Sequence, residues 1–128
     1  MSKRVLVVED EAVIRRLISI KLKGAGYEVT TANDGEEGLA VAVRDKPDLI
    51  VSDVMMPKKD GYTMVREVRE ALGSEAPVVI MLTSLGQTTD VATGLDAGAD
   101  DYIVKPFAPR ELIQRIEVVM LRHEQHRT

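Results

Sequence analysis

The sequence contains no cysteine, and its few histidines lie at one end. Without cysteine, disulfide bonds, thiol catalysis and cysteine-ligated zinc are excluded, and the composition fits a reducing cytoplasm. The two histidines, His123 and His126, both fall in the last six residues, so histidine catalysis within the core is excluded as well. We expect them to belong to a short polar C-terminal tail that begins at about residue 123.

Long apolar runs and an excess of basic residues are also missing. The first apolar run, Val5 to Val8, is followed by acids and is too short for a signal peptide or a membrane span. The formal net charge is -4, so the chain has no basic excess with which to neutralise the phosphates of a nucleic acid. The 128 residues fit one domain, residues 1–128. We therefore expect a cytoplasmic domain that binds neither membrane nor nucleic acid directly.

Short β-favouring runs alternate with helical patterns along the whole chain. The runs are RVLVV (4–8), YEVTT (27–31), DLIVS (48–52), PVVIML (77–82) and DYIV (101–104). Helices are predicted over 11–23, after a capping box of Asp34 and Glu37, over 62–72 up to Gly73, near 87–97, and from Pro109 to about Arg122. This alternation predicts a single doubly wound α/β domain with a parallel sheet.

Polar side chains follow four of the predicted strands. Glu9 and Asp10 follow the first, Asp53 the third, Thr83 the fourth and Lys105 the fifth. Each of them alone has a simpler interpretation as a helix cap or a turn residue. Together they would meet at the carboxyl edge of the sheet, where ligands of such folds bind. Neighbouring carboxylates repel one another unless a cation lies between them, and lysine and Mg²⁺ are the natural cations here. An aspartate in that setting can attack phosphorus.

Five motifs, in their order and spacing, resemble the receiver domains of two-component response regulators. They are VLVVEDE, DLIVSDVMMPKKDG, VIMLTS, GADDY and KPF, and the resemblance extends from about residue 3 to residue 122. It implies a flavodoxin-like (βα)5 fold with strand order 2-1-3-4-5. It also implies that Asp53 accepts a phosphoryl group from a sensor histidine kinase or a phosphotransfer protein. The chain would then be a signalling domain that catalyses only its own phosphorylation and slow dephosphorylation.

The same resemblance implies a divalent cation, Mg²⁺ or alternatively Mn²⁺. Asp10, Asp53 and the main-chain carbonyl of Met55 would hold it, and Glu9 would act through water. The acidic pair is Glu-Asp here, where many relatives have Asp-Asp.

Other family roles carry over to single positions. Thr83 and Lys105 would contact the phosphoryl group, and the Lys105–Pro106 peptide bond would be cis. Thr83 and Tyr102 would switch between two conformations. The side chains of Met55 and Leu85 would flank the path of the hydrolytic water. Because neither orients water well, we expect slow loss of the phosphoryl group.

The C-terminal part most resembles receivers of the OmpR/PhoB class of winged-helix transcription regulators. That resemblance implies control of an output domain or partner protein, and a homodimer through the fourth helix, fifth strand and fifth helix on phosphorylation. The matching charged positions are Asp96, Asp100, Asp101, Glu111, Arg115 and Arg122. Val91 stands where the class usually has a basic residue. These charges fit a solvated surface equally well.

Three other functions would be compatible with a doubly wound α/β fold. A flavodoxin needs a loop of backbone donors after its first strand, whereas EDEAV would repel a flavin phosphate. An aspartyl phosphatase usually has a second acid two residues after its nucleophile, and Met55 occupies that position. A phosphorylation-independent interaction domain of the same fold is the remaining alternative, and it would incorporate no phosphate.

Overall fold

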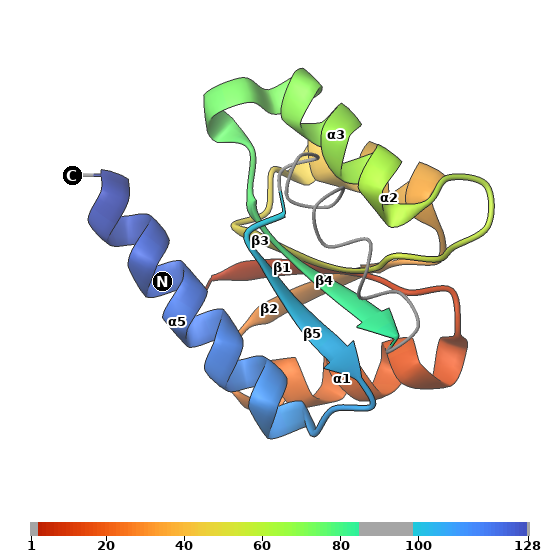
Figure 1. Ribbon diagram of the computed structural model, residues 1–128, viewed down its shortest axis with the longest axis vertical. Helices are drawn as coiled ribbons and strands as arrows, with labels where there is room; N and C mark the ends of the chain where they lie inside the picture. The colour runs from red at the N-terminus through yellow and green to blue at the C-terminus, as the bar shows by residue number, and fades with distance from the viewer. Residues whose placement is uncertain (1–2, 85–98, 128) are drawn as a thin grey trace.

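The computed structural model describes residues 3–84 and 99–127, and these form an alternating series of strands and helices (Figure 1). The predicted helix near 87–97 lies outside the described residues, as do Leu85, Val91 and Asp96. The described elements are β1 (Arg4–Val8), α1 (Ala12–Gly24), β2 (Glu28–Ala32), α2 (Gly35–Asp45), β3 (Leu49–Asp53), α3 (Gly61–Leu72), a 3-10 turn (Gly73–Glu75), β4 (Val78–Ser84), β5 (Asp101–Lys105) and α5 (Pro109–Arg127).

All five strands form one parallel sheet in the order β2-β1-β3-β4-β5, which confirms the predicted topology. The register pairs Val8 with Ser52, and Asp53 with Leu82, so the ends of β1, β3 and β4 lie at nearly the same level. Because the strands are parallel, their carboxyl ends share one edge of the sheet. The polar residues that follow them are therefore neighbours in space.

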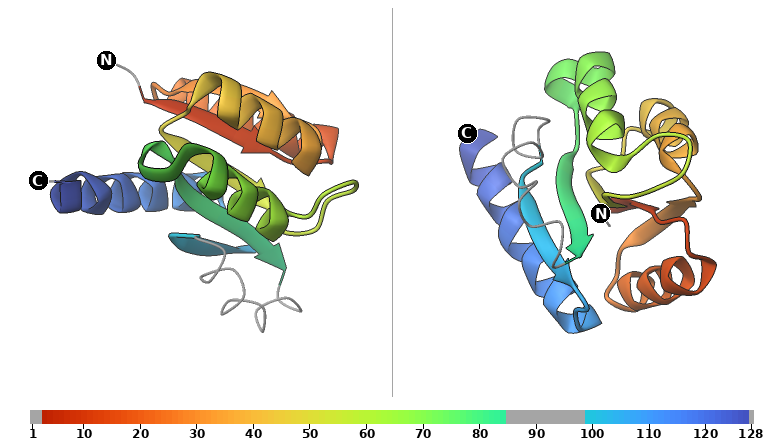
Figure 2. Two further views of the ribbon diagram at one scale, coloured as in Figure 1. Left: turned by 90° about the horizontal axis from the view of Figure 1, so that it is seen from above. Right: turned by 45° about the vertical axis from the view of Figure 1, so that its right-hand side comes forward.

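Helices cover both faces of the sheet, and alternate strand residues face opposite layers (Figure 2). On one face Leu6 and Ile50 pack in a cluster with residues of α2 and α3, such as Val65. On the other face Val7 and Ile80 pack with residues of α1 and α5. Burial on both faces explains the near-continuous apolar runs of the inner strands.

Local signals set the bounds of α2 and α3. The Asp34 carboxylate accepts a hydrogen bond from the Glu37 backbone N–H at 2.8 Å, as the predicted capping box requires. Glu37 in turn accepts from the Asn33 N–H at 2.6 Å rather than from Asp34 itself. Helix α3 begins after Asp60, which accepts from the Thr63 N–H, and ends before Gly73, whose φ of 55° suits glycine.

Helix α5 is longer than the sequence analysis predicted. It continues to Arg127, so the segment expected to be a polar tail from about residue 123 is helical. The reason is that residues 121–127 contain neither glycine nor proline and are rich in good helix formers. The extension also has a tertiary contact, because Glu124 lies 2.8 Å from the Lys3 ammonium. The last turns of α5 project past the edge of the sheet (Figure 2).

Among residues 3–84 and 99–127, no helix is both long enough and apolar enough to cross a membrane.

Candidate metal centre at the carboxyl edge of the sheet

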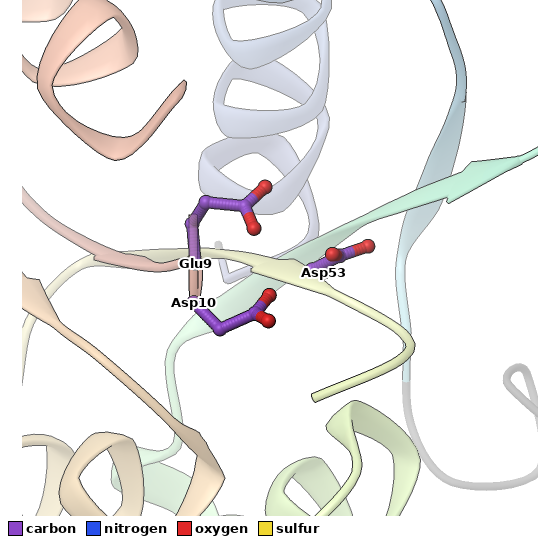
Figure 3. Close-up of side chains that lie close together, drawn as sticks. All are labelled: Glu9, Asp10 and Asp53. Atoms are coloured by element: carbon purple, nitrogen blue, oxygen red, sulfur yellow. The ribbon is translucent and has the colours of Figure 1, made fainter. Parts of the chain in front are cut away.

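Three carboxylates from two neighbouring strand ends converge at the carboxyl edge (Figure 3). Glu9 and Asp10 follow β1, and Asp53 is the last residue of β3. One carboxylate oxygen of each lies within 4.8 Å of the others, which is close enough for a shared cation. Glu9 is fully buried and Asp53 is 9% exposed, whereas Asp10 is exposed at the mouth of the cluster. The structure thus brings together the acids that the sequence analysis placed at one site.

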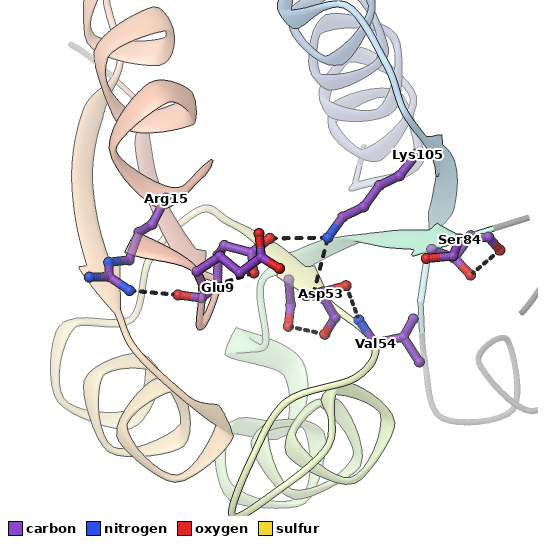
Figure 4. Close-up of polar contacts among 9 residues, drawn as sticks. Glu9, Arg15, Asp53, Val54, Ser84 and Lys105 are labelled. Carbon is purple, nitrogen blue, oxygen red and sulfur yellow. Dashed lines mark hydrogen bonds and ion pairs between the residues drawn. The ribbon is translucent and has the colours of Figure 1, made fainter. Parts of the chain in front are cut away.

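The ammonium of Lys105 reaches this cluster from the end of β5 (Figure 4). Its Nζ lies 3.1 Å from Glu9 Oε1 and 3.1 Å from Asp53 Oδ2. Lys105 therefore bridges Glu9 and Asp53, whereas Asp10 is not paired with it. The Lys105–Pro106 peptide bond is cis, as the family resemblance implied.

The electrostatics of the cluster favour a further cation. Burial is the largest effect on Glu9, and the negative charge of Asp53 adds to it, so together they raise the pKa of Glu9 from 4.5 to about 7. Hydrogen bonding by the Glu11 N–H and the charge of Lys105 act in the opposite direction and do not overcome them. Burial opposes the charge of Lys105, but attraction by Asp53 and Glu9 outweighs it and raises the pKa of the lysine. One ammonium thus leaves part of the acidic charge unneutralised.

Backbone contacts hold Asp53 at the end of its strand. Its Oδ1 accepts a hydrogen bond from the Val54 N–H at 3.0 Å, and its carbonyl accepts one from Ser52 Oγ at 2.9 Å. The loop that follows is closed by the Gly61 N–H, which donates to the Val54 carbonyl at 2.8 Å. A Cβ at Gly61 would lie 2.3 Å from the Asp53 carbonyl oxygen, so this close return of the chain requires glycine.

The loop between β3 and α3 carries Met55, whose side chain is 62% exposed. Its far end is braced against the start of α2. The carbonyl of Lys59 lies so close to Gly35 that a Cβ there would be 2.0 Å from the oxygen. The Lys59 ammonium is paired with Glu67, and the Lys58 ammonium lies 3.7 Å from Asp34. The loop is therefore tied to both α2 and α3.

Thr83 and Tyr102 lie on the two strands at the other side of Asp53. Thr83 is buried, and its hydroxyl donates to the Ser84 carbonyl at 3.3 Å. Tyr102 is partly buried, and it pairs in register with Met81 and packs against the same apolar cluster as α3. Thr83 thus lies on the strand next to that of Asp53, and Tyr102 lies one strand further away.

Three of the charged positions predicted for a dimer face have partners within the chain. Asp101 lies 3.2 Å from Nη1 of Arg115, which is another of these positions. Asp100 accepts from the Val79 N–H at 2.8 Å and from Arg69 at 3.1 Å. On α5, the predicted positions Glu111, Arg115 and Arg122 are exposed. The contacts of Asp100 serve to fasten the start of β5 to β4.

Sequence reasoning missed three residues that shape the site. Arg15 donates from Nη1 to the carbonyl of Glu9 at 2.8 Å, although the pair Arg15-Arg16 resembles an ordinary solvated helix face. Gly35 and Gly61 are required by close backbone approaches. Gly61 ends the motif DLIVSDVMMPKKDG, but nothing in the sequence indicates how near the chain returns to Asp53.

Comparisons with known proteins agree with this geometry. The family model described as "Response regulator receiver domain" matches residues 5–117. "Probable transcriptional regulator ycf27" of Cyanophora paradoxa is 52% identical over 122 residues, which are 95% of this chain and 50% of that protein. The "Alkaline phosphatase synthesis transcriptional regulatory protein PhoP" of Bacillus subtilis is 44% identical over 97% of this chain and 51% of its own length. The chain thus spans about half the length of these curated relatives.

Solved structures are similar over almost the whole chain. The chemotaxis response regulator CheY4 of Vibrio cholerae superposes with a TM-score of 0.85 at 38% identity, covering 93% of this chain and 99% of that one. The receiver domain of the sensor histidine kinase PA1611 of Pseudomonas aeruginosa has a TM-score of 0.84 at 32% identity, covering 94% and 98%. The latter was solved with a magnesium ion coordinated in its active site cleft.

Proposed function

We propose, from the premise that this chain belongs to the response regulator receiver domain family, that it accepts a phosphoryl group on Asp53 and passes the signal on by a change of conformation. The donor is a phosphohistidine of a sensor kinase or phosphotransfer protein, or a small molecule such as acetyl phosphate. The observation that carries the proposal is the buried Asp53 carboxylate, which lies 3.1 Å from Lys105 and within reach of two further acids.

The reaction is a transfer between two nucleophiles. One carboxylate oxygen of Asp53 attacks phosphorus while the bond from phosphorus to the imidazole nitrogen of the donor breaks, and the electron pair leaves with the imidazole. The product is an acyl phosphate. Lys105 stands where its ammonium can stabilise the phosphoryl oxygens, and the Val54 N–H holds the other carboxylate oxygen of Asp53. Thr83 supplies a hydroxyl to the phosphoryl group after transfer.

The donor set fits a hard divalent cation. Three carboxylates converge within 4.8 Å, and burial, with the negative charge of Asp53 added to it, raises the pKa of Glu9 despite the nearby Lys105 ammonium. Oxygen ligands of this kind suit Mg²⁺ and also Mn²⁺. We assign Asp10, Asp53 and the main-chain carbonyl of Met55 as ligands, with Glu9 acting through water. When bound, the ion would neutralise charge on the transferring phosphoryl group.

An apolar groove beside Lys105 marks the side from which a protein donor approaches. It lies between α1 and the segment after β5, has a volume of about 420 Å³, and is lined chiefly by apolar side chains, among them Ile14, Leu17 and Phe107. Leu17 is 47% exposed, although its spacing along the helix matches that of residues that face the core. Because Lys105 forms part of the groove wall, a phosphohistidine domain seated there would face Asp53.

We infer that the output is transcriptional, in a full-length protein that resides in the cytoplasm. The support is that two similar proteins are described as transcriptional regulators and are about twice as long as this chain. Phosphorylation would act on an output domain or partner through the face that the family builds from its fourth helix, β5 and α5. A homodimer through that face would use Asp100, Asp101, Glu111, Arg115 and Arg122, together with Asp96, which lies outside the described residues.

The phosphoryl group should be lost slowly. The exposed Met55 side chain offers only a thioether, a weak acceptor that orients water poorly, and Leu85, which lies outside the described residues, has no hydrogen-bonding group. Replacing Met55 by Asn and Leu85 by Glu should speed dephosphorylation by about tenfold or more, since orienting groups contribute of that order. Decay of the phosphorylated protein, followed by intact mass at fixed Mg²⁺, checks this, and equal decay in the double variant would refute it.

Incubation with acetyl phosphate and Mg²⁺ tests the proposal directly. The wild-type protein should gain the mass of one phosphoryl group, and Asp53→Asn should gain none. Asp45→Asn is the matched control, because Asp45 is a carboxylate at the far end of α2 that pairs with Arg44. Normal incorporation by Asp53→Asn would exclude Asp53 as the acceptor. No incorporation by the wild type would favour an interaction domain that works without phosphate.

A further inference from the structure

Arg15 reaches from the start of α1 to the residue that precedes Asp10 (Figure 4). Its Nη1 donates to the backbone carbonyl of Glu9 at 2.8 Å. Helical side chains lean toward the amino end of their helix, so an arginine in the first turns of α1 can contact a residue that lies before Glu11, the N-cap. A hydrogen bond from a guanidinium is charge-assisted and therefore among the stronger ones.

The other polar groups of Glu9 are held by separate parts of the chain. Its N–H donates to the Ala32 carbonyl at 3.1 Å. Its Oε1 accepts from the Lys105 ammonium at 3.1 Å, and its Oε2 accepts from the Glu11 N–H at 3.2 Å. Arg15 takes the carbonyl, so each polar group of Glu9 has a partner. The peptide group between Glu9 and Asp10 is thereby fixed on the α1 side.

This contact bears on Asp10 because a peptide group is planar. The Glu9 carbonyl lies in the same plane as the nitrogen and Cα of Asp10, so a bond to the carbonyl sets the direction in which Asp10 leaves the strand. Asp10 is exposed, and within residues 3–84 and 99–127 its carboxylate has no hydrogen bond or ion pair. In the described part of the protein, the backbone rather than a side-chain partner orients this acid.

We propose that Arg15 is a positioning residue for the divalent cation. By binding the Glu9 carbonyl, Arg15 holds the Glu9–Asp10 peptide so that Asp10 faces Asp53. Arg15 differs from Lys105 in its acceptor. Lys105 occupies carboxylate oxygens of Glu9 and Asp53, whereas Arg15 binds a carbonyl and leaves the acids free for the ion. This inference deepens the proposed function, since it concerns the metal of the same site. It requires metal binding but not phosphorylation.

Mg²⁺ titration of the purified protein by calorimetry tests the role of Arg15. Arg15→Gln should bind Mg²⁺ roughly tenfold more weakly than wild type, a typical effect of removing a group that orients a metal ligand. The Mg²⁺ affinity of Arg15→Lys should lie between those of wild type and Arg15→Gln, because the lysine ammonium can still donate to the Glu9 carbonyl. Arg16→Gln is the matched control and should bind within about twofold of wild type. Arg16 is the exposed neighbour on the same helix, and Arg16→Gln removes the same positive charge as Arg15→Gln.

A second readout separates positioning from general folding. Phosphorylation by acetyl phosphate, which does not need the protein-docking groove, should show a raised Mg²⁺ requirement in Arg15→Gln and a nearly normal maximal rate once Mg²⁺ is saturating. The metal-free unfolding of each variant is measured in urea alongside. A loss of stability in Arg15→Gln with unchanged Mg²⁺ affinity would overturn the proposal, as would equal affinity of Arg15→Gln and Arg16→Gln. If Arg15→Gln does not fold, the Mg²⁺ affinities of Arg15→Lys and Arg16→Gln are compared instead, and equal affinities would again overturn the proposal.

The two proposals fail separately. A wild-type protein that binds Mg²⁺ but takes no phosphoryl group would refute the proposed function, and the titrations would still decide the role of Arg15. A wild type that is phosphorylated normally, with Arg15→Gln unchanged in its Mg²⁺ dependence, would refute only the role of Arg15. A wild type that binds no Mg²⁺ would refute the role of Arg15 and the metal assignment together.

Discussion

At the scale of single residues, Glu9 is the acid whose environment differs most from water. It is fully buried, its carboxylate faces Lys105, and its pKa is raised from 4.5 to about 7 by burial and by the charge of Asp53. Between about pH 4.5 and pH 7, the folded metal-free protein therefore holds a proton on Glu9 that the unfolded chain would already have lost. The ionised form of Glu9 favours cation binding but destabilises the folded protein when no metal is bound.

This difference predicts opposite effects of pH on folding and on metal binding. Because the folded-state pKa of Glu9 is the higher one, its contribution to the free energy of unfolding should fall as the pH rises from about 4.5 to about 7, and should stay low above that. Mg²⁺ affinity should rise over the same range. Urea unfolding at pH 5 and pH 8 without metal, compared between wild type and Glu9→Gln, checks the first statement. A pH dependence that is the same in both proteins would contradict it.

Asp10, the exposed acid of the cluster, provides a second test of how metal binding and folding oppose each other at this site. Asp10→Asn should weaken Mg²⁺ binding by about tenfold or more, because losing a ligand costs at least as much as losing a group that orients one. The same change relieves repulsion among the three carboxylates, so the metal-free protein should unfold at a higher urea concentration. Titration calorimetry and urea unfolding of the one variant give both answers. Mg²⁺ affinity equal to wild type would show that Asp10 is not a ligand.

At the scale of elements, the start of α2 and the loop after β3 are fitted to each other at Gly35. A Cβ at this position would lie 2.0 Å from the Lys59 carbonyl oxygen, which is too close for any side chain. Gly35→Ala must therefore push the loop away from α2. We expect it to cost about 1–3 kcal/mol of stability, as overpacking typically does, and to weaken Mg²⁺ binding because the loop carries the Met55 carbonyl.

Gly24→Ala is the matched control for this substitution. Gly24 ends α1, and a Cβ there would meet nothing within 4 Å. The alanine should be neutral or stabilise by up to about 1 kcal/mol, through the lower entropy of the unfolded chain. Urea unfolding and Mg²⁺ titration of both variants make the comparison. If Gly35→Ala matched Gly24→Ala in both measurements, the fit between loop and helix would have no energetic importance.

The same elements show what the sequence could and could not reveal. The strands were predicted to within one or two residues because burial on both faces demands continuous apolar runs, as in VVIML. The end of α5 was missed because it depends on a tertiary contact, that of Glu124 with Lys3, which the sequence does not reveal. The residues of the acidic cluster were predictable because parallel strands bring their carboxyl ends together. The contact of Arg15 was not, since it depends on the direction that one long side chain takes.

At the scale of the whole molecule, the function requires that a change at Asp53 reach the α5 side of the sheet. Thr83 and Tyr102 lie on β4 and β5, the two strands that follow β3 toward the β5 edge of the sheet. We expect Thr83→Ala to be phosphorylated at close to the wild-type rate, because the nucleophile, Lys105 and the acids remain. The phosphorylated variant should nevertheless lose most of its partner response, measured as the change in partner affinity on phosphorylation. A wild-type response would mean that coupling does not pass through Thr83.

The contact between Lys3 and Glu124 places both ends of the described chain at the amino edge of the sheet, opposite the acids. This edge is suited to spectroscopic labelling. Because the sequence has no cysteine, one introduced thiol would be the only attachment point for a dye or spin label. Glu75 is a suitable position, since its pair with Lys46 is exposed and contributes little. β4 starts three residues later at Val78, and the four residues from there to Leu82, the register partner of Asp53, span roughly 13 Å. A reporter there would follow the conformation of the domain while leaving the phosphorylation chemistry undisturbed.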